Sequence, residues 1–275
     1  MRGEASLVSD QEARTKFAPL LEGLGAGAFD VAEELFGFVN LLDADPRLER
    51  ALTDPSRPAQ DKVRVVDELL KGRAQDATVE ILRDLSGRRW SKLAHIANAA
   101  EDLAVDAVAC YTAVKGETAQ VAGELAQIHS ALIDLPIVLF RLSDEYSDSK
   151  ARVALLDELL AGKNLHQVTI QLSEHATRDL RGRRFLETLN WLIDRFSSHM
   201  KETMVTVVTA VPLSQEQSDK VAEVYARKLG RNIHINAVVD PAVLGGMRVE
   251  YGSEVTDHTV AAQLKGLKRQ MAVAG

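Results

Sequence analysis

Residues 65–73 read VVDELLKGR, and residues 155–163 read LLDELLAGK, which is the same stretch 90 positions further along the chain. Other matches keep this offset or follow it after a short insertion. They pair Pro46 with Pro136, Glu34-Leu35 with Glu124-Leu125, Leu52-Thr53-Asp54 with Leu142-Ser143-Asp144, and DLSGRRW at 84–90 with DLRGRRF at 179–185. An ordered series of this length indicates a tandem duplication.

Each copy has the pattern of a small helical bundle. In the first, apolar residues at helical spacing follow Asp30, which has Glu33 three positions later, the arrangement of a capping box. We therefore expect Asp30 to cap a helix that ends at Asp45-Pro46, because the residue before proline avoids the helical conformation. The repeated stretch predicts a further helix, closed by Gly72 in one copy and by Gly162 in the other.

The sequence changes character after about residue 200, where valine and threonine become frequent and favour strands. Strands are expected at 204–211, 233–237, 247–251 and 254–256. Ser214 and Gln217 form a capping box for a helix that Gly230 closes. Asp257 is expected to cap a last helix, whose apolar face is Val260, Leu264, Leu267 and Met271.

The predicted fold is therefore mainly α: two tandem helical-bundle units followed by a small α/β domain. We place the first unit at 1–105, the second at 106–200 and the α/β domain at 201–275. The composition agrees, since 46% of the residues are hydrophobic, 27% are charged and only 5% are aromatic.

Charge and cysteine content restrict the classes of partner. A net charge of -7 argues against nucleic acid as a partner. Cys110 is the only cysteine, so neither an intrachain disulfide nor a thiolate metal cluster can form. No apolar run reaches the ~18 residues that a membrane span requires, so direct membrane insertion is not expected.

No constellation of residues indicates catalysis, cofactor binding or metal binding. His166 and His175 lack an acidic ligand at metal-site spacing. The glycines at 23–27 have neither a preceding strand nor a Gly-Lys-Ser/Thr ending, which favours a link between helices over a nucleotide loop. The two Gly-Arg-Arg clusters could bind phosphate or a partner, but we favour turns between helices with solvated or carboxylate-paired arginines, and with Trp90 and Phe185 as core anchors.

The carboxyl-terminal pattern resembles the delta subunit family of F-type ATP synthases, relatives of the mitochondrial oligomycin-sensitivity-conferring protein. The likeness covers about 65 residues, and we call its most distinctive positions the signature residues. They are Pro212, Gly230, Asp240, Pro241, Leu244, Gly245, Gly246, Gly252, Asp257, Thr259 and Leu264. Thr259 stands where the family usually has serine. The usual subunit has one helical domain, and this chain is similar to the form that carries two.

The resemblance implies a non-catalytic part of the peripheral stalk, or stator. The helical part would grip the amphipathic N-terminal helices of the alpha subunits, and the α/β domain would hold the b-subunit stalk. One copy would sit on the cytoplasmic face of the membrane as a peripheral subunit, without a cofactor, and resist the torque of the rotor. The alternative from another class is a helical-repeat scaffold with an unrelated partner.

Overall fold

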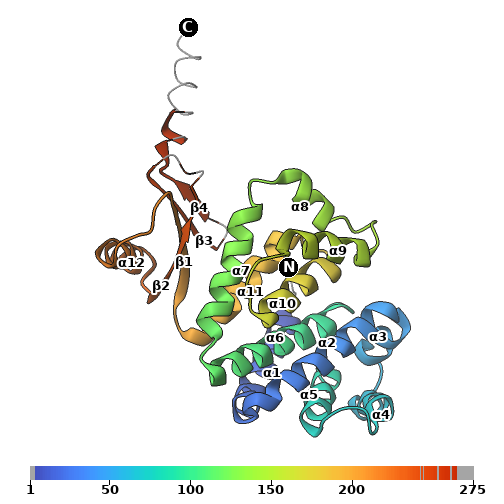
Figure 1. Cartoon of the computed structure of the whole chain (residues 1–275). Helices are drawn as coiled ribbons and strands as arrows, with labels where there is room; N and C mark the ends of the chain where they lie inside the picture. The colour runs from blue at the N-terminus through green and yellow to red at the C-terminus, as the bar shows by residue number, and fades with distance from the viewer. Residues whose placement is uncertain (1–3, 242, 244, 253, 261, 265–275) are drawn as a thin grey trace. The chain divides into compact units, whose positions relative to one another are not determined.

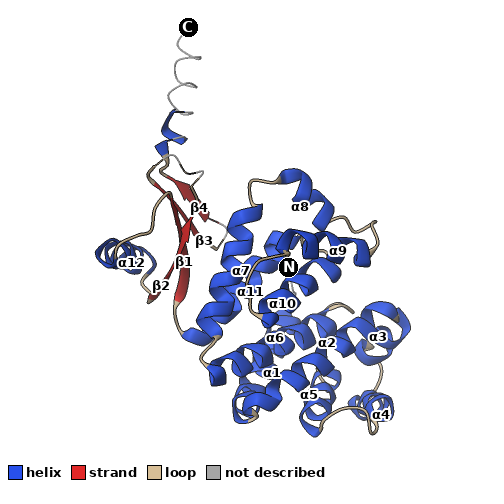
Figure 2. Ribbon diagram, in the orientation of Figure 1, coloured by secondary structure: helices blue, strands red, loops and turns tan. Residues whose placement is uncertain are grey.

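A computed structural model describes residues 4–264 apart from residues 242, 244, 253 and 261. The chain forms two compact units, Met1–Glu117 and Thr118–Gly275. All regular elements described in the first unit are helices, while the second combines helices with a four-stranded sheet (Figures 1 and 2). The predicted fold class, mainly α with a small C-terminal α/β domain, is confirmed.

The first unit is a bundle in which α2 packs against α6, α4 against α5, and α1 against both α5 and α6. Its largest fully buried side chains include Phe17, Leu35 and Leu85. The elements are α1 (Glu4–Gly23), η1 (Gly25–Gly27), α2 (Ala28–Ala44), α3 (Pro46–Thr53), α4 (Ala59–Leu70), α5 (Asp76–Gly87) and α6 (His95–Lys115).

The second unit repeats this order with α7 packed against α11 and α9 against α10. Its bundle core holds Leu125, Phe185 and Phe196. The helices are α7 (Thr118–Leu132), α8 (Pro136–Leu142), α9 (Ser149–Leu160), α10 (Gln167–Arg178) and α11 (Phe185–Met200). The first residues of α7, α8 and α9 lie 90 positions after those of α2, α3 and α4, and α10 starts 91 after α5.

One glutamate in each copy ties neighbouring helices in the same way. Glu34 on α2 accepts hydrogen bonds from the backbone N–H of Gln75, at 3.0 Å, and from the hydroxyl of Thr78. Glu124 on α7 accepts them from the N–H of His166, at 2.8 Å, and from the hydroxyl of Thr169. Each carboxylate therefore satisfies an otherwise unpaired N–H at the start of α5 or α10.

Two details of the predicted repeat are wrong. Asp30 does not cap α2, because the 3₁₀ turn at Gly25–Gly27 runs directly into a helix that begins at Ala28, and Asp30 lies in its first turn. The stretches 84–90 and 179–185 are also not equivalent. Asp84 lies inside α5, whereas Asp179 follows the end of α10 and Phe185 starts α11. The matching residues therefore occupy different positions relative to the helices of the two copies.

The sheet has the order β2-β1-β3-β4. Strands β1 (Thr203–Thr209) and β2 (Ile233–Val239) are parallel and joined through α12 (Gln215–Leu229), while β3 (Met247–Tyr251) and β4 (Glu254–Asp257) extend it antiparallel. The predicted strands and the helix between Ser214 and Gly230 are confirmed within a few residues. Val205, Val207 and Val249 form the core on one face, against α12.

The domain boundaries remain predictions. The expected limit after residue 105 falls inside α6, and the compact units meet between Glu117 and Thr118, just after Gly116 closes that helix in the left-handed conformation. The expected limit after residue 200 coincides with the end of α11, yet the sheet and the second bundle belong to one compact unit.

Candidate partner-binding surfaces

The described signature residues build turns at both ends of the sheet and cap its helices. Pro212 follows β1, Gly230 ends α12 with a φ of 65°, and Gly252 turns β3 into β4 with a φ of 53°. Asp240 donates its N–H to the carbonyl of Thr209 and accepts at its own carbonyl from Val243, so the chain turns immediately after β2, where Pro241 stands. Leu244 lies outside the described residues, as do Leu267 and Met271 of the apolar face predicted for the last helix.

Gly246 is required by a close backbone crossing. Its φ is 79°, and a side-chain carbon there would lie 2.4 Å from the carbonyl oxygen of His258. Gly245 next to it has a φ of 90°. Backbone bonds from His258 to Met247 and from Val260 to Gly245 fasten the same crossing. These two glycines bring the segment after β4 against the start of β3.

Thr259, and not Asp257, caps the last helix. Helical structure begins at Val260, and the Thr259 hydroxyl oxygen accepts a hydrogen bond from the N–H of Ala262. Asp257 instead accepts from the N–H of Thr259, two residues on, and shapes the turn before the helix. Burial would raise the pKa of Asp257, but the hydrogen bonds from Thr259 outweigh it and lower that pKa. Our expectation for Asp257 is therefore corrected by two residues.

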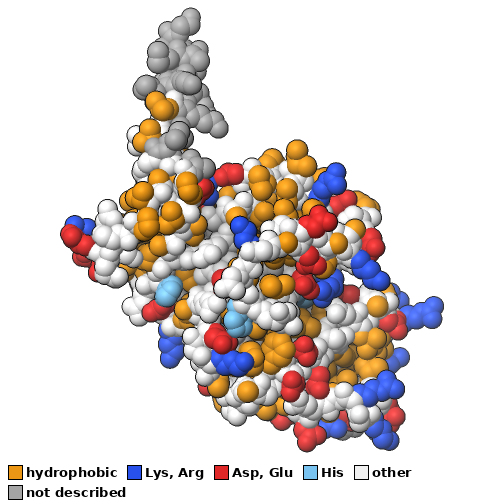
Figure 3. Space-filling model, in the orientation of Figure 1, with side chains coloured by type: hydrophobic (Ala, Val, Ile, Leu, Met, Phe, Trp, Pro, Cys, Tyr) orange, Lys and Arg blue, Asp and Glu red, His pale blue; other side chains and the backbone are white. Residues whose placement is uncertain are grey.

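Large apolar side chains are exposed at the end of the sheet where β1 and β2 finish and β3 begins. Val211 follows β1, Val239 ends β2, and Val260 and Leu264 belong to the last helix. Their exposed fractions lie between 43% and 67%. Figure 3 shows apolar atoms gathered over this part of the sheet. We call these four residues the sheet-end patch. Exposed apolar patches are typical of partner-binding sites, which makes the sheet-end patch a candidate surface.

The opposite face of the sheet packs on α7 through a close contact that the sequence did not reveal. Asn236 on β2 donates its side-chain N–H to the carbonyl of Gly123, at 3.1 Å. A side-chain carbon on Gly123 would lie 3.4 Å from the Asn236 amide oxygen. The position equivalent to Gly123 in the first copy is Glu33, which is exposed. Glycine in α7 therefore fits the approach of the sheet.

A buried charged group completes this contact. Glu250 on β3 accepts a hydrogen bond from the Ser130 hydroxyl at 3.1 Å, and His129 Nδ1 lies 3.6 Å from its other oxygen. Arg248 Nε is 2.8 Å from Glu250 Oε1, an ion pair without hydrogen-bond alignment, and its Nη1 donates to Asp134 at 2.7 Å. Burial would raise the pKa of Glu250, but the bonds and charges of these neighbours lower it.

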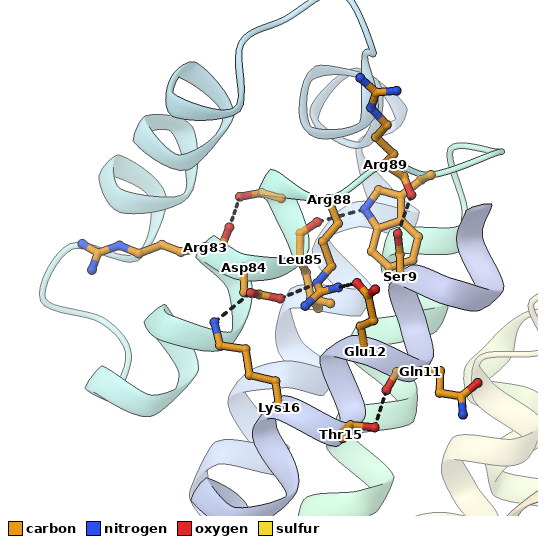
Figure 4. A network of polar contacts seen from close by, with 12 residues as sticks. Ser9, Gln11, Glu12, Thr15, Lys16, Arg83, Asp84, Leu85, Arg88 and Arg89 are labelled. Carbon is orange, nitrogen blue, oxygen red and sulfur yellow. Dashed lines mark hydrogen bonds and ion pairs between the residues drawn. The ribbon is translucent and has the colours of Figure 1, made fainter.

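The first Gly-Arg-Arg cluster is a structural tie, as expected. Arg88, the residue after α5, pairs with Asp84 on that helix and with Glu12 on α1, the latter at 2.8 Å (Figure 4). Lys16 on α1 also reaches Asp84, at 2.8 Å. Burial would raise the pKa of Asp84, but the two cations outweigh it and lower that pKa. Trp90 is half-buried and donates its indole N–H to the carbonyl of Leu85. These side chains hold α1 against the end of α5.

The second cluster uses other partners. The guanidinium of Arg183 lies 4.7 Å from the ring centre of Trp191 on α11, a cation–π contact. Phe185 is fully buried, which confirms its predicted role as a core anchor, whereas Trp90 reaches only an intermediate burial. Within the described residues, no group of three potential ligands could hold a metal ion. His166 caps α10, with its Nδ1 accepting from the N–H of Val168.

In the described part of the chain, no helix combines the length and the apolar character needed to cross a membrane. Cys110 is buried, and burial raises the pKa of its thiol to about 11. The thiol is therefore protonated at neutral pH and unreactive.

Comparison with known proteins accounts for both halves of the chain. The family model described as ATP synthase delta (OSCP) subunit matches twice, over residues 26–113 and 105–271. The two matches overlap within α6. The second match takes in helices α7–α11 together with the sheet, and the first takes in the extra helical copy.

Whole-length relatives agree with this assignment. The ATP synthase subunit delta of Bifidobacterium longum (strain DJO10A) is 52% identical over 98% of each chain. The ATP synthase subunit delta of Beutenbergia cavernae is 34% identical over 98% of each chain, and that of Streptomyces griseus is 32% identical over 94% of this chain and 96% of its own. The chain belongs to the ATP synthase delta (OSCP) subunit family, in a form with a duplicated helical domain.

Proposed function

We propose that this chain joins the catalytic head of a proton-translocating F-type ATP synthase to the b-subunit stalk and so resists the torque of the rotor. Members of its family are non-catalytic subunits of the peripheral stalk. In this proposal the helical part binds N-terminal helices of the alpha subunits, and the α/β domain binds the b subunit. A single copy acts in each complex, peripherally, on the cytoplasmic face of the membrane.

The observation that carries this proposal is the sheet-end patch. The signature residues Gly245 and Gly246 set the crossing that positions Val260 and the start of the last helix. The patch is apolar and exposed, as a surface for a stalk helix should be. A joint under torque also benefits from contacts spread over several residues, because no single contact then carries the load.

The alternative, a helical-repeat scaffold with an unrelated partner, has no observation in its favour. The family matches account for the doubled helices and for the α/β domain together. A second candidate function is therefore not proposed.

The proposal is tested by recovering the wild-type chain from solubilised membranes and identifying what comes with it. We expect the alpha, beta and b subunits. The variant Val239→Glu/Leu264→Glu should lose the b subunit, since it places two charges in the sheet-end patch. Val224→Glu is the matched control, because Val224 is 52% exposed on α12, outside the patch. A wild-type chain that recovers neither head nor stalk would contradict the proposal.

A further inference from the structure

The first helical copy gathers positive charge around an open cavity at the end of α3. The cavity has a volume of about 230 Å³, and its lining residues are Pro46, Arg47, Arg50, Ala51, Asp54 and Arg57. Arg47 and Arg50 belong to α3, and Arg57 lies in the turn that follows it. We call these three arginines the arginine cluster. Among the described residues, none accepts a hydrogen bond or forms an ion pair with their guanidinium groups.

The single carboxylate at the cavity does not neutralise this cluster. One oxygen of Asp54 accepts hydrogen bonds from the N–H and the hydroxyl of Ser56, at 2.8 and 2.7 Å. These bonds lower the pKa of Asp54. The carboxylate therefore shapes the turn after α3, and three positive charges line the cavity against one negative charge.

A buried lysine lies close to the same turn. Lys62 on α4 is only 5% exposed, and its ammonium has neither a hydrogen-bond acceptor nor an ion-pair partner in the part of the chain that the structure describes. Its charge interacts with those of Asp54 and Arg57. Burial is the main cause that lowers the pKa of Lys62, and the charge of Arg57 adds to it, while Asp54 opposes them. A buried cation without a paired anion is costly, so this position favours a negative group.

The second copy satisfies the equivalent position in another way. Arg152 replaces Lys62 there, and its guanidinium donates to four backbone carbonyls, those of Asp144, Ser147, Thr177 and Arg178. The residues equivalent to the arginine cluster are Ile137, Phe140 and Ser147. The repeat therefore folds without positive charge around this cavity and without an unpaired buried cation, so packing within the copy does not explain either feature.

Charge, geometry and size describe the ligand. Guanidinium groups bind phosphate through paired hydrogen bonds, and a lysine ammonium adds a compact positive charge. A cavity of about 230 Å³ is smaller than the ~300–1,000 Å³ of pockets that enclose a drug-sized molecule. It therefore suits one phosphate group, with any remainder of the ligand in solvent. A single carboxylate has fewer oxygens and less charge, and would leave part of the cluster unpaired.

We propose that the arginine cluster and Lys62 form a binding site for a phosphate group, carried either by a free phosphate ion or by a lipid headgroup. The arginines bind the phosphate oxygens, and Lys62 supplies positive charge from the interior. The site belongs to the first copy alone. It goes beyond the proposed function and does not depend on it, since the purified chain binds the ligand without head or stalk.

The first experiment is calorimetric titration of the purified full-length chain with inorganic phosphate, at an ionic strength kept constant with chloride. We expect a Kd of about 1 mM or tighter. Arg47→Gln/Arg50→Gln should weaken binding about 10-fold or more, because charged hydrogen bonds to phosphate are lost. The matched control is Arg64→Gln/Arg73→Gln, which removes the same charge outside the cavity and should leave the Kd within about twofold.

Lys62→Met distinguishes a ligand-binding lysine from a structural one. It should weaken phosphate binding at least about threefold while the urea midpoint stays the same or rises, because a buried unpaired charge is removed. A lower midpoint with an unchanged Kd would mean that Lys62 is structural and would overturn its assignment to the site.

Co-sedimentation with phosphatidylglycerol vesicles separates the two sources of phosphate. Sedimentation that inorganic phosphate and Arg47→Gln/Arg50→Gln both abolish identifies a lipid headgroup, and absence of sedimentation together with calorimetric binding identifies free phosphate. A wild-type chain that does not bind inorganic phosphate would overturn the proposal, whatever the vesicles show. Equal weakening in the cluster variant and in Arg64→Gln/Arg73→Gln would also overturn it, because only general charge would then be at work.

Discussion

The two helical copies, α2–α5 and α7–α10, share the hydrogen bonds that hold neighbouring helices together, but they differ in their exposed side chains. Glu34 and Glu124 each hold the start of a later helix by a backbone N–H and a threonine hydroxyl. On the surface, Arg47 and Arg50 stand where the other copy has Ile137 and Phe140, and Glu33 stands where it has Gly123. The two copies thus share the glutamates that hold their helices together, whereas the side chains at equivalent surface positions differ in polarity and charge.

The comparison of the two copies separates residues needed for folding from residues that a partner can constrain. A carboxylate that satisfies a helix start is needed by any copy that folds in this way. An outward-facing position is free to change unless a partner covers it. The residues that differ between the copies are therefore the ones to examine for binding, and the residues that match are the ones to examine for stability.

The largest expected effect on stability concerns Trp90 and Phe185, which match in the sequence repeat but occupy different positions in the fold. Phe185→Ala should lower the free energy of unfolding of the second unit by about 4 kcal/mol, because it empties a fully buried site. Trp90→Ala should cost about 1 kcal/mol, the loss of one hydrogen bond and partial burial. Urea unfolding measures both. Equal losses would mean that the two residues are equivalent after all.

The shared glutamates should give matching losses. Glu34→Ala and Glu124→Ala are each expected to reduce the free energy of unfolding by about 2 kcal/mol, since a hydrogen-bonded N–H and hydroxyl lose a charged acceptor. Glu33→Ala, on the exposed side of α2, is the control and should change it by less than about 0.5 kcal/mol. A loss in only one copy would break the equivalence of the two ties.

Exchanging Gly123 and Glu33 between the copies should weaken the contact between α7 and the sheet, and should have little effect in the first copy. Gly123→Glu is expected to cost about 2 kcal/mol, because its side chain meets Asn236 and disturbs the bond to the Gly123 carbonyl. Hydrogen exchange of β2 amides should then accelerate relative to those of α9. The reverse change, Glu33→Gly, should cost only the helix propensity of glycine, about 1 kcal/mol. Unchanged exchange in β2 would show that the contact does not hold the sheet.

The smallest effect is expected in acid. The pKa of Glu250 is lowered in the folded chain, so its ionised form contributes stability above the unfolded pKa of about 4.3, and this is lost as pH falls through the folded pKa. Glu250→Gln should flatten that acid-side decline in the second unit by about 1 kcal/mol and leave the first unit unchanged. Urea unfolding between about pH 3 and pH 6 would reveal it, and an identical slope in both proteins would rule out the contribution.

Much of the fold follows from local pattern. Ser214 and Gln217 predicted the start of α12, Gly230 its end, and Asp45-Pro46 the boundary between α2 and α3, because these residues act on backbone groups only a few positions away. The predictions that Asp30 and Asp257 cap helices were wrong. In a sequence, an acidic residue in the first helical turn, or two residues before the cap, cannot be distinguished from one at the capping position itself. Sequence alone cannot show which N–H each carboxylate will reach.

The exposed surfaces were harder to predict, since exposure depends on what the rest of the chain covers. Ile137 and Phe140 have the composition of a core, and only the folded chain shows that they face solvent. Gly123, Asn236 and Glu250 come together from separate elements, so no local signal marks them. The signature residues pointed to the family and lie mainly in turns and caps, and their assignment as structural residues of the family remains a prediction.

The most direct test of the whole account is a density map of the intact ATP synthase that contains this chain. We expect the chain to span from the crown of the catalytic head to the end of the stalk, with its helical part against the head and a stalk helix on Val239 and Leu264. A map in which the chain touches only the head or only the stalk, or in which the sheet-end patch faces solvent, would contradict it.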